Sequence, residues 1–173
     1  ERYFDSDNNR RIMEKVAEKC YRPTNRLLLD LIARHDGAFR VSFSLTGVFI
    51  EQCREYAPDV LESFAELYGT GCVEFLAETY YHSLSFLYSR REFVEQVKRH
   101  VEAIENLFGQ TPTVFRNTEL IYNNDLALLI EAMGCFDAIL AEGADHILGY
   151  RSANFVYRPR GCRHVKLLMK NYS

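Results

Sequence analysis

The segment Phe115-Arg116-Asn117-Thr118-Glu119-Leu120-Ile121-Tyr122 places a carboxylate directly after a buried run of the chain. A short β-prone run, residues 113–115, leads into it, and a helix start, Asn123-Asn124-Asp125, follows it. Polar groups are costly where a buried strand ends unless they have partners or a function. In (β/α) barrels, that end of the strands carries the catalytic residues. Glu119 is therefore the leading candidate for a catalytic group.

The sequence before this segment predicts helices interrupted by two strands. Apolar residues at helical spacing indicate a helix over residues 8–19, which Pro23 is expected to break, and Thr24-Asn25 is expected to cap a second helix. Alternating residues 39–45 and the apolar run 72–77 indicate strands. Between them we expect a helix through Phe49, Ile50 and Cys53, and a further helix that begins at Pro58 and ends near Gly69.

The rest of the chain alternates strands with helices. An aromatic loop, residues 80–88, precedes a helix that opens on the capping box Ser89-Arg90-Arg91-Glu92 and ends at Gly109. We expect its buried stripe to consist of Phe93, Val97, Val101, Ile104 and Leu107. The remaining expected elements are strands at 113–115, 136–140 and 164–169, a helix at 126–133 that stops at Gly134, and a loop or short helix at 143–161.

Strands separated by helical patterns predict a parallel sheet with right-handed crossover helices. The chain has 173 residues, whereas a full eight-unit barrel takes about 250. We therefore predict an α/β fold in which residues 1–173 form part of a single domain, an incomplete (β/α) barrel. The opening Glu1-Arg2-Tyr3-Phe4, without Met or signal peptide, indicates a segment of a longer polypeptide.

Composition excludes several classes of function. No run approaches the roughly 18 apolar residues that span a bilayer, and a net charge of −3 with interspersed signs gives no reason to expect nucleic acid or anionic membrane as partner. The five cysteines include no Cys-x-x-Cys pair. They are interpreted as buried free thiols in a reducing cytoplasm rather than a zinc site. No cofactor is expected.

Polar residues recur at the ends of the predicted strands. They are Ser44 and Thr46, then Glu74 and Glu78, then Glu119, then Glu142. Each of the other carboxylates has a structural alternative: Glu74 as an exposed strand residue, Glu78 as a cap or ion-pair partner, and Glu142 as a loop residue. Their recurrence at one topological point favours a shared site.

Carboxylates and aromatic rings at a barrel rim suit carbohydrate, since sugar faces pack on aromatic rings and carboxylates accept bonds from hydroxyls. Glycoside cleavage needs a carboxylate pair. For Tyr80-Tyr81-His82 the structural alternative is aromatic packing over the barrel end. A metal-ligand role for His82, as in barrel deacetylases, lacks an Asp-Asp or His-x-x-x-His partner, so we predict no metal.

Two blocks, Gly71 to Leu84 and Phe115 to Tyr122, resemble glycoside hydrolase family 57 in its α-amylase-like branch. Residues 5–31, 39–47 and 141–145 are also similar to that branch. The resemblance covers nearly the whole chain and implies a (β/α)7 barrel with a retaining mechanism on α-glucans. It implies that Glu119 is the nucleophile and Glu74 a sugar-binding glutamate.

Three differences from the family accompany the resemblance. The family begins with a His-Gln-Pro strand, which this chain lacks. The family's acid/base aspartate lies in a later segment, for which residues 170–173 look like the lead-in, so we expect it beyond Ser173. Several members carry Trp three positions before the nucleophile, where this chain has Arg116.

The prediction is an intracellular α-amylase-like glycosidase that acts on α-1,4-glucans or maltooligosaccharides. Glu119 is the predicted nucleophile, and the predicted substrate contacts are Glu74, Glu78, Tyr80, Tyr81, His82, Arg116 and Glu142. The alternatives are a 4-α-glucanotransferase and a glucan-binding relative without catalysis. Unpaired strand edges predict that the segment alone self-associates into homo-oligomers.

Overall fold

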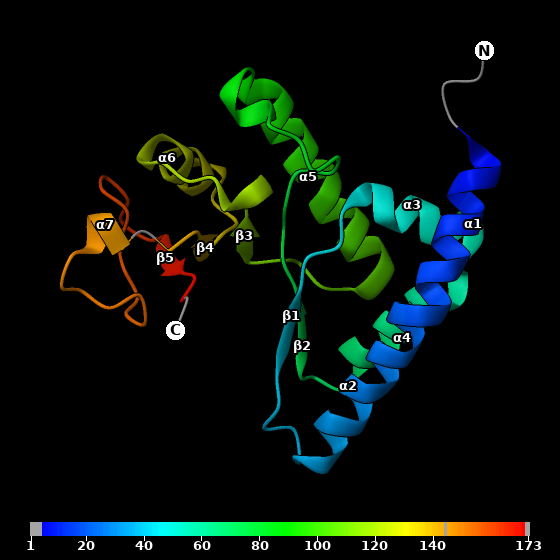
Figure 1. Ribbon diagram of the computed structural model, residues 1–173. Helices are drawn as coiled ribbons and strands as arrows, with labels where there is room; N and C mark the ends of the chain where they lie inside the picture. Colours follow the sequence, from blue (N-terminus) through cyan, green and yellow to red (C-terminus); the bar gives the residue numbers. More distant parts are fainter. Residues whose placement is uncertain (1–4, 144, 172–173) are drawn as a thin grey trace. The chain divides into compact units, whose positions relative to one another are not determined.

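The computed structural model describes residues 5–143 and 145–171 (Figure 1). The chain forms two compact units, one up to Glu74 and one from Phe75 onward. Each unit is described by itself.

The first unit opens on a long helical rod (Figure 1). Its parts are α1 (Ser6–Val16), the π-helical turn η1 (Ala17–Tyr21) and α2 (Arg22–Arg34). The predicted break at Pro23 is wrong, because the π turn precedes the proline and the N–H of Arg22 bonds the carbonyl of Ala17. A π turn changes the hydrogen-bond register where a proline would otherwise leave an unpaired carbonyl. The predicted cap at Thr24-Asn25 is also wrong: Asn25 is buried inside α2 and donates to Ser63 Oγ over 2.8 Å.

The rest of the first unit matches the predicted order. It comprises β1 (Val41–Phe43), α3 (Gly47–Tyr56), α4 (Pro58–Gly69) and β2 (Val73–Phe75), whose last residue begins the second unit. The two strands pair, and Val41 N–H donates to the Cys72 carbonyl over 3.0 Å. The side chain of Thr46 caps α3 by accepting from the Phe49 N–H, so this strand-end hydroxyl has a structural partner.

The second unit contains a parallel sheet. Its elements are η2 (Ser85–Leu87), α5 (Arg90–Phe108), β3 (Val114–Arg116), η3 (Thr118–Leu120), α6 (Asn124–Met133), β4 (Ala138–Ala141), α7 (Asp145–Leu148) and β5 (Lys166–Met169). The strand order is β3-β4-β5, with Phe115 opposite Ile139 and Ile139 opposite Leu167. Because all three strands are parallel, their carboxyl ends lie at one edge, as predicted.

Both outer strands of this sheet have a further neighbour. Ala77 forms a parallel bridge with Phe115 beside β3, and Tyr157 forms an antiparallel bridge with Leu167 beside β5. The Tyr157 and Leu167 backbones exchange two hydrogen bonds of 3.0 and 2.8 Å. The edge of β5 is therefore partly covered by the preceding loop.

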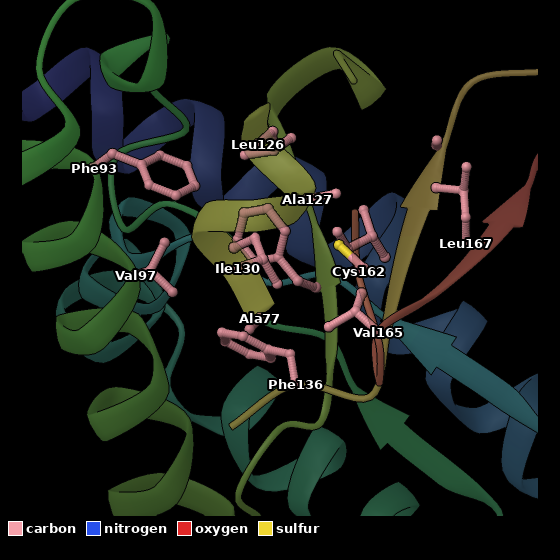
Figure 2. Packing of buried hydrophobic residues seen from close by; sticks show 13 residues of the cluster. Ala77, Phe93, Val97, Leu126, Ala127, Ile130, Phe136, Cys162, Val165 and Leu167 are labelled. Carbon is pink, nitrogen blue, oxygen red and sulfur yellow. The ribbon is translucent and has the colours of Figure 1, made fainter. Parts of the chain in front are cut away.

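Helices α5 and α6 supply the apolar cover of this unit (Figure 2). Phe93 and Val97 on α5 lie in one buried cluster with Leu126, Ala127 and Ile130 on α6. Ser89 caps α5 and Gly109 ends it in a left-handed conformation, as the capping box and the glycine predicted.

The predicted buried stripe of α5 is only partly right. Phe93, Val97 and Ile104 are buried, but Val101 and Leu107 are half-buried. Gln96, His100 and Phe108 are buried in addition. At about 3.6 residues per turn, positions 93, 97, 100, 104 and 108 share one face of the helix, whereas position 101 lies to its side.

All five cysteines are free, as predicted, but only three are buried. Cys20 and Cys135 are exposed, contrary to the expectation. Cys135 directly follows Gly134, the left-handed C-cap of α6, where the chain turns at the surface. Within the described residues, no helix combines the length and apolar character needed to cross a membrane.

Candidate active site

Three strand ends of the second unit converge as the sequence predicted. The Glu119 loop follows β3, Glu142 follows β4 and Lys170 follows β5. The Glu142 N–H contacts the Leu120 carbonyl at 3.4 Å, and Lys170 Nζ lies 3.6 Å from Glu142 Oε1. Parallel pairing thus brings the candidate nucleophile and a second carboxylate to one edge.

Glu119 occupies an unusual backbone conformation. Its φ is 53° and that of Leu120 is 56°, both in the left-handed region. Non-glycine residues there are strained by about 1–3 kcal/mol each and persist only where the surroundings fix them. The Asn117 side chain fixes this turn by donating to the Ile121 carbonyl over 3.0 Å. The side chain of Glu119 is 74% exposed, so a substrate can reach it.

His82 joins Glu119 to a buried carboxylate. Its Nδ1 lies 3.0 Å from Glu78 Oε2, and its Nε2 lies 3.3 Å from Glu119 Oε1. The hydrogen bond with Glu78 raises the pKa of His82, the bond with Glu119 adds to the rise, and burial and the charge of Arg116 oppose it. A ring whose two nitrogens both face carboxylate oxygens can donate to both only as the imidazolium, so this geometry favours the charged form of His82.

A hydroxyl network ties the two loops together. Thr79 Oγ1 lies 3.1 Å from Thr118 Oγ1, and both threonines are buried. Thr118 donates to the Ser83 carbonyl over 2.8 Å, while the Ser83 N–H donates to Thr79 Oγ1 over 2.9 Å. The loop carrying His82 is thereby held against the loop carrying Glu119.

Tyr80 and Tyr81 are both engaged by Arg99 of α5. The Arg99 guanidinium lies 4.0 Å from the centroid of the buried Tyr80 ring, and it donates a short hydrogen bond to the Tyr81 hydroxyl. One face of Tyr80 is therefore covered by protein, whereas Tyr81 is exposed. Arg99 thus holds both rings, and a contact of either ring with sugar stays a prediction.

A cavity of about 770 Å³ opens beside the candidate nucleophile. Its wall combines Glu119 and Glu142 with apolar and basic side chains, among them Tyr122, Ile147, Leu148, Tyr157, Arg158, Arg160 and Met169. Oε1 of Glu142 is buried and accepts no hydrogen bond from the described residues. Lys170 Nζ, 3.6 Å away, offsets the charge of this oxygen without a hydrogen bond, so the oxygen can still accept one from a ligand.

Two predicted contacts remain, Arg116 and Glu74. Arg116 is half-buried in β3. Glu74 is half-buried in β2 and belongs to the first unit, whereas Glu119 belongs to the second. A cleft shared by these two glutamates therefore stays a prediction.

The described part of the chain groups no three His, Cys, Asp or Glu side chains that could hold a metal ion. Glu78 and Glu119 contact opposite nitrogens of the His82 ring. Their oxygens therefore do not converge on one point, as the ligands of a metal must.

Three contributors to this site were not predicted as site residues. Lys170 directly follows β5. The expectation that polar residues at strand ends form the site could therefore have included it. Asn117 lay in the quoted segment, but its role depends on the turn at Glu119. Nothing in the sequence placed Arg99 against the tyrosines, because that contact depends on how α5 packs.

Sequence comparison identifies the family of this chain. The sequence profile described as glycosyl hydrolase family 57 matches residues 1–173. A protein of Methanocaldococcus jannaschii named "Putative alpha-amylase" is 47% identical over 174 residues, covering 99% of this chain and 36% of that protein. The chain belongs to glycoside hydrolase family 57, and it spans about a third of the length of that relative.

Two solved structures show the fold. The 4-alpha-glucanotransferase of Thermococcus litoralis aligns with a TM-score of 0.79 at 15% identity, over 93% of this chain and 25% of that chain. A family 57-type branching enzyme of Pyrococcus horikoshii aligns with a TM-score of 0.55 at 17% identity, over 96% of this chain and 32% of that chain. The predicted fold class, an incomplete (β/α)7 barrel with parallel strands and crossover helices, is confirmed.

Proposed function

We propose that residues 1–173 are part of a single catalytic barrel domain of a retaining glycoside hydrolase of the α-amylase type, acting on α-1,4-glucans or maltooligosaccharides. One observation carries the proposal. In a family 57 chain, Glu119 is an exposed strand-end carboxylate that lines a cavity of about 770 Å³. The name of the Methanocaldococcus jannaschii relative supports the α-amylase type.

The chemistry assigned to Glu119 is nucleophilic. Oε1 contacts His82, so the other carboxylate oxygen attacks the anomeric carbon and the bond to the leaving sugar oxygen breaks. An aspartate beyond Ser173 protonates that oxygen. The same aspartate then takes a proton from water, which displaces Glu119 from the glycosyl-enzyme and restores the configuration.

Among the predicted sugar contacts, Glu142 has the strongest support. It lines the same cavity as Glu119, and its Oε1 faces Lys170 Nζ at 3.6 Å but accepts no hydrogen bond from the described residues. A sugar hydroxyl would satisfy that oxygen. Glu78 is only 1% exposed. This burial favours a role in binding His82 over direct contact with sugar.

The experiment compares Glu119→Gln with Glu102→Gln in the full-length protein. Glu102 is an exposed glutamate of α5 and serves as the matched control. Loss of a nucleophile lowers turnover by about 10³-fold or more, whereas Glu102→Gln stays at the wild-type rate. Glucan affinity of Glu119→Gln is expected to persist, because the amide keeps the shape of the carboxylate.

The products separate the alternatives. Reducing ends released from maltooligosaccharide indicate hydrolysis. Redistribution of chain lengths without new reducing ends indicates 4-α-glucanotransfer, in which a sugar hydroxyl replaces water. Glucan binding without either reaction in the wild type indicates a binding protein. Turnover near normal in Glu119→Gln would overturn the assignment of Glu119.

A further inference from the structure

We infer that His82, backed by the buried Glu78, is a positioning residue that holds the Glu119 carboxylate for attack. The inference rests on the proposed function and deepens it. The contacts are continuous: Glu78 Oε2 to His82 Nδ1 at 3.0 Å, and His82 Nε2 to Glu119 Oε1 at 3.3 Å.

The exposed fraction of the side chains increases from Glu78 through His82 to Glu119. Glu78 is 1% exposed, His82 36% and Glu119 74%. Glu78, the inner of the two glutamates, is buried in the protein. Its backbone N–H also contacts Nδ1 of the buried His100 at 3.4 Å. The outer carboxylate reaches solvent. His82, held by the buried Glu78, therefore restrains the exposed side chain of Glu119.

The backbone is strained at both ends of the outer contact. His82 has a φ of 52° and Glu119 a φ of 53°, although neither is glycine. The hydroxyl pair of Thr79 and Thr118, 3.1 Å apart, holds these two turns against each other. Strain of this kind persists where surrounding contacts fix it. Here the strained turn orients the His82 ring toward the Glu119 carboxylate.

The ring fixes one oxygen of Glu119 and leaves the other for the sugar. As the second oxygen bonds the anomeric carbon, the bond from that carbon to the leaving group breaks. When water later displaces Glu119, the carboxylate charge returns beside the imidazolium. His82 gains and loses no proton in either step, and its effect is orientation and charge stabilisation.

The contribution depends on the charge of the ring. The charged groups that act on it are Glu78 and Glu119, which favour the imidazolium, and Arg116, which opposes it. Glu78 is the largest of these influences on the pKa of His82. Replacing it by neutral Gln lowers that pKa, so the ring loses its proton at a lower pH.

The test uses maltosyl fluoride as substrate of the full-length protein. Fluoride leaves without protonation, so the acid/base aspartate does not set the pH dependence of the first step. We expect His82→Gln to lower kcat/KM by about 10- to 100-fold, the effect of losing a hydrogen bond to a charged group, with little change in KM. We expect Glu78→Gln to move the alkaline loss of kcat/KM to lower pH. His35→Gln, an exposed histidine of the first unit, is the matched control.

The outcomes distinguish the positioning role of His82 from the nucleophilic role of Glu119. A folded His82→Gln with kcat/KM within about twofold of wild type, or an unmoved alkaline limb in folded Glu78→Gln, overturns the positioning role. If Glu78→Gln does not fold, His82→Gln alone tests the positioning role. The His82 side chain is partly exposed, so this variant is expected to fold. Loss of activity in Glu119→Gln beside normal His82→Gln defeats only this inference. Retained activity in Glu119→Gln defeats the proposed function itself.

Discussion

Nε2 of His82 lies 3.3 Å from Oε1 of Glu119. This contact joins the loop after β3 to the loop that follows Ala77. Both loops flank the same edge of the sheet, because Ala77 pairs with Phe115 of β3. A histidine from one strand end therefore contacts the candidate nucleophile from the next. The positioning role inferred for His82 depends on this contact.

The same contact has a pH signature in stability. The pKa of folded His82 is raised above its usual value of 6.5, chiefly by the hydrogen bond with Glu78. The stabilisation is therefore fully present below about pH 6.5 and is lost as pH rises through the folded pKa. It amounts to about 1 kcal/mol or less, since the ring is partly exposed. Urea unfolding of wild type and His82→Gln across this range measures it, and a difference that grows with pH would contradict it.

Glu131 gives the opposite pH dependence. Its carboxylate accepts the backbone N–H groups of Arg163, His164 and Val165 over 2.8–3.1 Å. These bonds lower its pKa from 4.5 to about 2. The stabilisation is present above pH 4.5 and is lost as pH falls toward 2. Hydrogen exchange of the three amides should show faster exchange in Glu131→Gln at neutral pH, and equal protection in both proteins there would contradict the anchor.

The core of the second unit depends on α6. Ile130 is fully buried in the cluster of Figure 2, whereas Leu128 on the same helix is 44% exposed. Ile130→Ala is expected to cost about 2–5 kcal/mol of unfolding free energy, through lost burial and the cavity it leaves. Leu128→Ala is expected to cost clearly less, since its side chain is partly in water. Equal losses in denaturant unfolding would mean that α6 presents a different face to the sheet.

The segment of residues 1–173, expressed alone, is expected to release no reducing sugar from starch or maltooligosaccharide. The reason is that the proposed acid/base aspartate lies beyond Ser173, and one carboxylate of the pair retains little catalysis. Self-association through strand edges is also expected, though Tyr157 already covers part of β5. Activity should return when the chain is extended to include the aspartate. Robust turnover by the segment would place the acid within it, and Glu142, beside Glu119 in the cavity, would then be examined first.

Local signals in the sequence predicted most of the fold. The alternation of strands and helices, the caps at Ser89 and Asn123, and the ends at Gly109 and Gly134 all agree with the structure. The rod through Pro23 could not be predicted, because a π turn reassigns hydrogen bonds in a way that residue preference does not encode.

The site was predictable to the level of strand ends. Glu119 and Glu142 reach one cavity because parallel strands end on one edge. The contacts of His82 with two carboxylates depend on left-handed turns at non-glycine residues, which sequence patterns do not signal. Arg99 meets Tyr80 only because α5 packs beside that loop. Tertiary packing therefore determines the part of the site that sequence reasoning missed.

We predict that Glu119 becomes covalently glycosylated during turnover. The most direct test incubates the full-length protein with 5-fluoro-α-glucosyl fluoride, which slows both steps and accumulates the glycosyl-enzyme. Peptide mass spectrometry is predicted to find one added sugar on the peptide that contains Glu119, and none in Glu119→Gln. A sugar attached to another residue, or a protein that turns over α-glucan without ever being labelled, would contradict the claim.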